Sequence, residues 1–135
     1  MKKVVFLCVH NSGRSQMAEA FAKKLGEGKI VAESAGTQPA DGLNPQAVAA
    51  MEEAGYDMSG HYPKVMTAEM VDSADRLITM GCGVDAQTCP AAFVPTEDWG
   101  LDDPKDQPIE KVREIRDAIE ARVRKLIEEM TQEGS

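Results

Sequence analysis

The chain has 135 residues and a formal net charge of −8, with 42% apolar and 4% aromatic residues. This length predicts a single domain over residues 1–135, and the composition predicts a mostly aliphatic core. The acidic balance argues against binding to nucleic acid or to an anionic membrane, and no apolar run approaches the roughly 20 residues of a membrane span. The apolar run after Lys3 is shorter than the about 7–15 residues of a secretory signal. We therefore expect a cytoplasmic protein. We also expect it to be a monomer.

The segment KVVFLCVHNSGRS, residues 3–15, joins a predicted strand to a predicted helix. The apolar residues 4–7 are typical of a buried strand, and the residues at 15–25 predict an amphipathic helix. A strand, a turn of small residues and a helix start, in this order, build an anion-binding site, because the turn amides and the helix dipole converge on one point. We expect a tetrahedral oxyanion to be bound by Val9, His10, Asn11, Ser12, Gly13, Arg14 and Ser15.

Cys8 and Arg14 carry the chemistry that this segment predicts. Thiols at helix N-termini reach pKa values of roughly 3.5–7.5, against about 8.5 when free, so we expect Cys8 to ionise and act as a nucleophile. Arg14 closes over the anion with its planar fork of donors. Ser15 donates its hydroxyl to the Cys8 sulfur or caps the helix, and Asn11 holds the loop with its side chain. His10 contacts the ligand or only adds positive potential.

The rest of the chain alternates between strands and helices. We predict strands at residues 30–32, 76–80 and 93–95, and helices starting at Asn44-Pro45, after Thr67, and over residues 109–130. This alternation is typical of the α/β class with a parallel, doubly wound sheet. Ligands bind such sheets at the carboxyl ends of the strands, where Cys8 and Cys82 both lie.

Cys82 and Cys89 are separated by six residues in GCGVDAQTCP. Two inert thiols are one interpretation. A zinc site is disfavoured, because the sequence has no C-x2-C pair and only two histidines, His10 and His61. A redox pair fits best, because glycines flank Cys82 and give that end of the segment conformational freedom.

Asp102 and Asp103 follow Trp99 in an acidic loop punctuated by proline. The loop is either a solvated turn or a source of catalysis, with Asp103 reaching over the anion as general acid to a leaving oxygen. Two adjacent carboxylates near a bound oxyanion are expected to raise each other's pKa, which suits an acid.

Residues 8–19, CVHNSGRSQMAE, resemble the anion loop and first helix of the thioredoxin-coupled arsenate reductases, which share the low-molecular-weight protein tyrosine phosphatase fold. Cys82 and Cys89 match the second and third redox cysteines of that family, and residues 99–104 resemble its aspartate loop. The resemblance implies a three-layer sandwich around a four-stranded parallel sheet. It also implies reduction of arsenate to arsenite through a Cys8–arsenic adduct and a disulfide relay.

The resemblance further implies thioredoxin as the reductant of that relay, with glutaredoxin or mycothiol as other donors, and phosphate or sulfate as mimics of arsenate. No metal and no permanently bound cofactor are expected. Some members of the family bind potassium through residues matching Asn11, Glu19 and Ser34 together with an aspartate. Lys64 stands at the place of that aspartate, so we expect its ammonium to pair with Glu19 instead of the ion.

A low-molecular-weight protein tyrosine phosphatase that uses Cys8, Arg14 and Asp103 is the alternative function. Such an enzyme needs only one cysteine. Phosphatases of this fold carry tyrosines just after the aspartate-proline pair, whereas Lys105, Asp106 and Gln107 follow here. That difference and the extra thiol pair favour the reductase.

Overall fold

The computed structural model describes residues 1–80 and 97–133. Its elements in chain order are β1 (Lys2–Cys8), α1 (Arg14–Leu25), β2 (Ile30–Gly36), α2 (Pro45–Glu53), α3 (Ala68–Ser73), β3 (Arg76–Thr79), β4 (Glu97–Asp98) and α4 (Ile109–Glu133). The strand predicted at residues 93–95 lies outside the described residues, and the fourth strand that the structure describes is β4.

The four strands form one parallel sheet in the order β2-β1-β3-β4. From β1 the chain passes to β2 on one side and later to β3 on the other, so the connection reverses direction at β1. Ligands of open parallel sheets bind outside the carboxyl ends of the strands at such a reversal. Cys8 is the last residue of β1, and it pairs with Gly36 at the end of β2. The predicted α/β class and four-stranded parallel sheet are confirmed.

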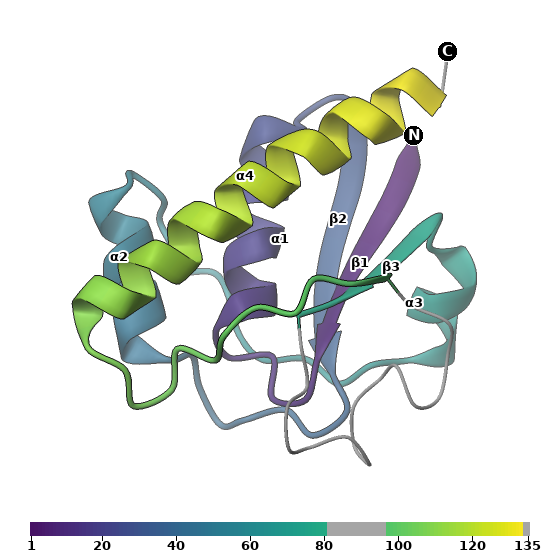
Figure 1. The fold of residues 1–135 in the computed structure, drawn as a ribbon. Coiled ribbons are helices and arrows are strands. Elements are labelled where there is room, and N and C mark those ends of the chain that lie inside the picture. Colours follow the sequence, from purple (N-terminus) through teal and green to yellow (C-terminus); the bar gives the residue numbers. More distant parts are fainter. Residues whose placement is uncertain (81–96, 134–135) are drawn as a thin grey trace.

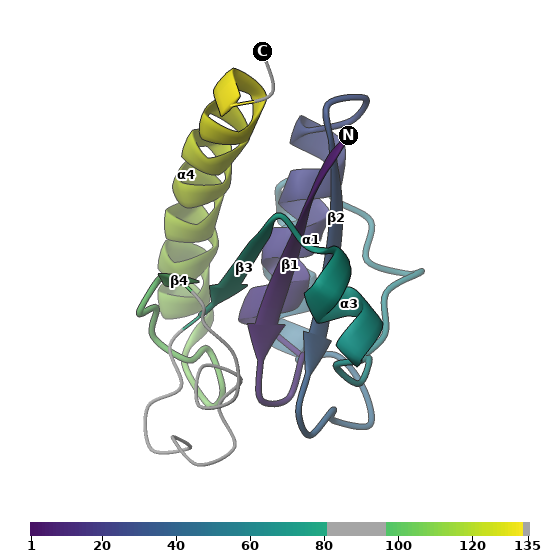
Figure 2. The same ribbon diagram turned by 90° about the vertical axis from the view of Figure 1, so that its right-hand side faces the viewer.

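Helices cover both faces of the sheet and make three layers (Figure 1, Figure 2). The larger core lies between the sheet and the helices α1, α2 and α4, and Phe6, Phe21 and Ile119 are fully buried in it. A smaller cluster around Val5 and Leu7 packs on the other face, where α3 lies. Among the helices of the described residues, none combines the length and the apolar character needed to cross a membrane.

Two predicted helix starts have the geometry that their sequences indicate. Asn44 Oδ1 accepts hydrogen bonds from the backbone N–H groups of Gln46 and Ala47 at 2.9 and 3.2 Å, and Pro45 takes the first helical position of α2. Thr67 Oγ1 accepts from the backbone N–H of Met70 at 3.1 Å at the start of α3. The α2 cap also fixes one wall of the candidate site, because Asn44 N donates to Ser12 O at 2.8 Å.

Candidate active site

The loop between β1 and α1 turns its backbone carbonyls outward. Six consecutive carbonyl oxygens, from Cys8 to Gly13, each accept a hydrogen bond from a donor outside the loop. The donors are Thr37 N, Gln38 N, Ala40 N, Gln16 Nε2, Asn44 N and Met17 N, at 2.8–3.3 Å. In a planar trans peptide the N–H points opposite to the C=O, so this arrangement turns the loop amides toward the space that the loop encloses. That space is a cradle for an oxyanion.

Cys8 Sγ lies at the bottom of this cradle, and the residue is 7% exposed. The backbone N–H of Asn11 donates to the sulfur at 3.0 Å, and Ser15 Oγ lies 2.9 Å from it. The residue that precedes α1 is Gly13, with no side-chain cap, so the interpretation of Ser15 as the helix cap is wrong. The Ser15 hydroxyl instead forms hydrogen bonds with the Cys8 sulfur and with the side chain of Asn11.

Arg14 connects the cradle to two other segments. Its Nη1 donates to Met80 O at 2.9 Å and to Leu101 O at 2.6 Å, and its Nη2 lies 3.9 Å from Asp103 Oδ2. Met80 directly follows β3, and Leu101 precedes the two aspartates. The guanidinium therefore ties the end of the sheet and the aspartate loop to the anion loop.

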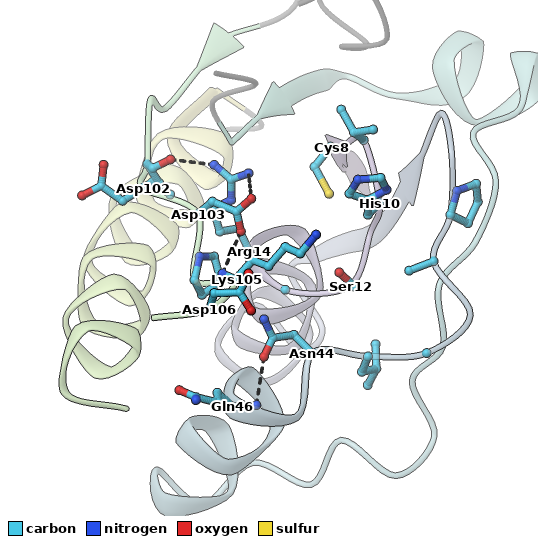
Figure 3. Close-up of a pocket in the computed structure, with 18 of the residues that line it drawn as sticks. Cys8, His10, Ser12, Arg14, Asn44, Gln46, Asp102, Asp103, Lys105 and Asp106 are labelled. Atoms are coloured by element: carbon cyan, nitrogen blue, oxygen red, sulfur yellow. Dashed lines mark hydrogen bonds and ion pairs between the residues drawn. The ribbon is translucent and has the colours of Figure 1, made fainter. Parts of the chain in front are cut away.

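The two aspartates have different environments (Figure 3). Asp103 lies beside Arg14, and its Oδ1 accepts the backbone N–H of Lys105 at 3.0 Å. Asp102 instead pairs with Lys111 of α4 at 2.9 Å. The hydrogen bond and the charge of Lys111 lower the pKa of Asp102, so the expectation that the neighbouring carboxylates raise each other's pKa is wrong for Asp102.

His10 lines the groove, and its ring contacts the segment after β2. Its Nδ1 lies 3.0 Å from Gln38 O, and the residue is exposed. A carbonyl only accepts, so Nδ1 carries the proton in this contact. The imidazole thus joins the anion loop to the segment that follows β2.

An open groove of about 1340 Å³ leads from Cys8 to the surface. Its walls are residues 38–46 on one side and Asp98 with residues 100–106 on the other, and the anion loop forms its floor (Figure 3). No Phe, Tyr or Trp is among the described residues that line it. Several aspartates line it instead, including Asp41, Asp98 and Asp106. The part of the groove that the structure describes therefore offers no aromatic surface to bind a phenyl ring.

Glu19 lies 2% exposed behind the loop, at the centre of a charged cluster. Lys64 Nζ is 3.2 Å from its Oε1, as expected from the sequence, and Lys23 Nζ is 2.8 Å from its Oε2. Ser34 Oγ also donates to Oε1. Burial raises the pKa of Glu19, but the bonds from Lys23 and Ser34 and the two ammonium charges outweigh it and lower the pKa below its ordinary value. Within residues 1–80 and 97–133, no group of three or more His, Cys, Asp or Glu side chains could hold a metal ion.

Gln16 and His61 belong to the same layer and were missed by the sequence reasoning. Gln16 is 0% exposed and contacts Asn11, Tyr62 and His61. The available signal was its place in the first turn of α1, directly after the loop, where a long amide is able to reach back to loop carbonyls. His61 gave no signal, because only the fold brings it to α1.

The comparisons with known proteins agree with this geometry. The family model described as low molecular weight phosphotyrosine protein phosphatase matches residues 3–135. The chain belongs to that family. A glutaredoxin arsenate reductase of Synechocystis is 44% identical over 131 residues, covering 94% of this chain and 97% of the relative.

Two solved structures of arsenate reductases share the fold of this chain. An arsenate reductase in the phosphate binding state matches with a TM-score of 0.84 and 42% identity, covering 96% of this chain and 99% of its own. A thioredoxin-dependent arsenate reductase of Corynebacterium glutamicum matches with a TM-score of 0.79 and 32% identity, covering 98% of this chain and 63% of its own. The remaining predicted catalytic residues, Cys82 and Cys89, lie outside the described residues.

Proposed function

We propose that this protein is an arsenate reductase that converts arsenate to arsenite. Arsenate is a tetrahedral oxyanion, and the cradle of outward-turned carbonyls and inward-turned amides above Cys8 is the observation that carries the proposal. The arsenate reductases among its relatives support it, as do the two further cysteines in the sequence.

The first step joins sulfur to arsenic. The loop amides and Arg14 hold arsenate, and the Cys8 thiolate attacks the arsenic atom. Asp103 donates a proton to the departing oxygen, which leaves as water or hydroxide. The product is a Cys8–arsenic(V) adduct, in which no electron has yet been transferred.

The second step transfers the two electrons. The Cys82 thiolate attacks the Cys8 sulfur, the electron pair of the sulfur–arsenic bond stays on arsenic, and arsenite leaves. A Cys8–Cys82 disulfide remains. Cys89 then attacks Cys82, which releases the Cys8 thiolate and leaves a Cys82–Cys89 disulfide. Three thiols therefore account for one two-electron reduction and for the recovery of the nucleophile.

An external thiol reductant must reduce the final disulfide. Thioredoxin, with a potential near −270 mV, reduces a pair whose potential is higher, and we favour it, with glutaredoxin or mycothiol as the other donors. All three donors need thiols that are kept reduced, and we therefore propose that the reaction takes place in the cytoplasm.

Lys64 lies behind the anion loop, beside the buried Glu19. We propose that its ammonium takes the place of the potassium ion that some relatives bind, so that no cation is needed behind the loop. Its 3.2 Å contact with Glu19 supports this. The enzyme is then expected to work equally well in sodium and in potassium buffers, and a severalfold higher rate in potassium would contradict the idea.

The reductase is tested by arsenate-dependent oxidation of NADPH coupled through thioredoxin and its reductase, with glutaredoxin and mycothiol systems run in parallel. We expect turnover with at least one donor, and loss of turnover in Cys8→Ser, Cys82→Ser and Cys89→Ser alike. Activity that survives in Cys82→Ser and Cys89→Ser would contradict the relay.

Hydrolysis of a phosphomonoester through a phosphocysteine remains the alternative, because it uses the same Cys8, Arg14 and Asp103. The described residues that line the groove include no aromatic side chain, and this favours arsenate over an aryl phosphate. Rapid hydrolysis of para-nitrophenyl phosphate by a protein that does not turn over arsenate would reverse this preference.

A further inference from the structure

We propose that Gln16 is a positioning residue that sets the direction of a hydrogen-bond chain ending on the Cys8 sulfur. Gln16 is fully buried in the first turn of α1 and does not reach the groove. The chain runs from Gln16 through Asn11 and Ser15 to Cys8. The proposal deepens the proposed function, because it assumes that Cys8 is the nucleophile, but its test reads the thiol and needs no arsenate.

The orientation of the Gln16 amide follows from its fixed neighbours. Its Nε2 lies 2.8 Å from Tyr62 O and 3.1 Å from Asn11 O. Backbone carbonyls only accept hydrogen bonds, so the nitrogen must face them. The oxygen, Oε1, then faces His61 Nδ1 at 3.1 Å, and that ring nitrogen carries the proton.

The orientation of the Asn11 amide follows in turn. Its Oδ1 lies 2.9 Å from Gln16 Nε2 and 2.9 Å from the backbone nitrogen of Lys64. Both of these groups are donors, so the oxygen faces them. The Asn11 nitrogen, Nδ2, is thereby directed to Ser15 Oγ at 2.8 Å.

The Ser15 hydroxyl is the last link. Its oxygen accepts from Asn11, so its single hydrogen is free to point at Cys8 Sγ, 2.9 Å away. The backbone N–H of Asn11 donates to the same sulfur at 3.0 Å. The sulfur thus receives two donors, and hydrogen bonds to the charged form of a group favour that form.

Gln16 is the link on which the direction depends most. Without the Gln16 Nε2, the side-chain oxygen of Asn11 keeps only the Lys64 N–H as a donor, and the backbone carbonyls of Asn11 and Tyr62 each lose a donor. A rotated Asn11 amide would present its oxygen to Ser15. The hydroxyl would then turn to Asn11, and the sulfur would lose one of its donors.

The test is the pH dependence of Cys8 alkylation in a protein whose other two cysteines are replaced by serine. Gln16→Met preserves length and apolar packing but removes both donors and the acceptor. We expect the midpoint of the pH profile of iodoacetamide reaction, followed by mass spectrometry, to rise by about 0.5–1 pH unit. Below the midpoint this is a fall of about 3–10-fold in rate.

Ile119→Val is the matched control for lost stability, because Ile119 is equally buried but lies on α4 in the larger core, away from the loop. Its midpoint should stay within about 0.2 unit of the parent, since shortening a core aliphatic changes stability without changing this polar chain. A folded Gln16→Met protein with an unshifted midpoint would overturn the proposal. If the midpoint shifts but the unaltered protein does not reduce arsenate, the role of Gln16 is supported and only the proposed function is contradicted.

A second measurement covers the case in which Gln16→Met does not fold. In the unaltered protein, NMR hydrogen exchange of side-chain amides should show the Gln16 NH₂ protons exchanging at least 10-fold more slowly than those of the exposed Gln46. Equal exchange rates would show that the Gln16 nitrogen is not held by its carbonyl partners, and would overturn the proposal.

Discussion

The floor and the rim of the groove are built in opposite ways. Directly behind the floor lies a layer of buried polar side chains that supports it, all at most 2% exposed: Asn11, Ser15, Gln16, Glu19 and Ser34. The rim is made of exposed charges, and the side chains of Asp102 and Asp103 are 73% and 59% exposed. Within the described residues, every buried side-chain nitrogen and oxygen has a hydrogen-bond partner.

The buried layer and the exposed rim therefore have different roles. A fully satisfied buried network is rigid, because each broken bond leaves a group that water cannot reach, so the floor holds the sulfur and the cradle in place before the anion arrives. Exposed charges are screened and mobile. The rim can therefore move around a bound oxyanion, and its contribution should appear in turnover rather than in stability.

Asp103→Asn is the change with the largest expected effect on the rim. The amide cannot donate a proton to the leaving oxygen, so we expect turnover to fall by about 100-fold while the melting temperature stays within a few degrees. Steady-state kinetics and thermal unfolding measure the two quantities. Asp102→Asn is the matched control, since Asp102 is engaged with Lys111, and it should keep most of the turnover. Equal losses in both variants would mean that the rim acts only through its charge.

Gly36→Ala is expected to displace the backbone of the anion loop. A Cβ at this position would lie 2.5 Å from Val9 O and 3.0 Å from Cys8 O, so the anion loop must shift. We expect the free energy of unfolding to fall by about 1–3 kcal/mol, as for other overpacked sites, and the KM for arsenate to rise by about 10-fold. Gly60→Ala, where a Cβ meets nothing within 4 Å, is the control. Unchanged kinetics in Gly36→Ala would mean that the loop is not as rigid as the floor suggests.

The smallest expected effect is a pH dependence of stability from His61. Burial lowers the pKa of His61 below 6.5, although the nearby Glu19 carboxylate opposes this and Lys23 and Lys64 add to it. Between the lowered value and about 6.5 the unfolded state binds more protons than the folded state, so stability rises with pH in that window and is lost as the pH falls through it.

Replacing this imidazole should flatten that slope. In His61→Gln we expect the free energy of unfolding, measured with urea between pH 5 and pH 7, to change with pH by less than in the parent, the difference being under about 1 kcal/mol. The lowered pKa of Glu19 acts only at more acidic pH, so it does not confound the window. A slope identical to the parent would mean that His61 titrates alike in the folded and unfolded states.

Much of this fold could be predicted, because the signals for its helices and strands lie within each element. These signals are the spacing of apolar residues and the helix caps at Asn44-Pro45 and Thr67. The anion loop was equally predictable, since the strand, turn and helix that form it are consecutive. β2 extends to Gly36, beyond the predicted residues 30–32. Its last residues lack an apolar run, and they are held in the sheet by pairing with β1, which is not visible locally.

The contacts behind the loop were the hardest part to predict. Lys64 was placed beside Glu19 only through the family resemblance, and Gln16 with His61 was not anticipated. These residues lie 45 positions apart in sequence and meet through the path of the segment after α2. The different environments of the two neighbouring aspartates depended likewise on Lys111, a residue of the distant helix α4.

The central claim, that one oxyanion cradle feeds a relay of three thiols, is tested most directly by a single turnover. The reduced protein is mixed with one equivalent of arsenate without any external reductant, and arsenite and disulfides are then quantified by chromatography and peptide mass mapping. We expect one arsenite per chain, a Cys82–Cys89 disulfide, and Cys8 as the remaining free thiol. No arsenite, or arsenite with Cys82 and Cys89 both still reduced, would contradict the account.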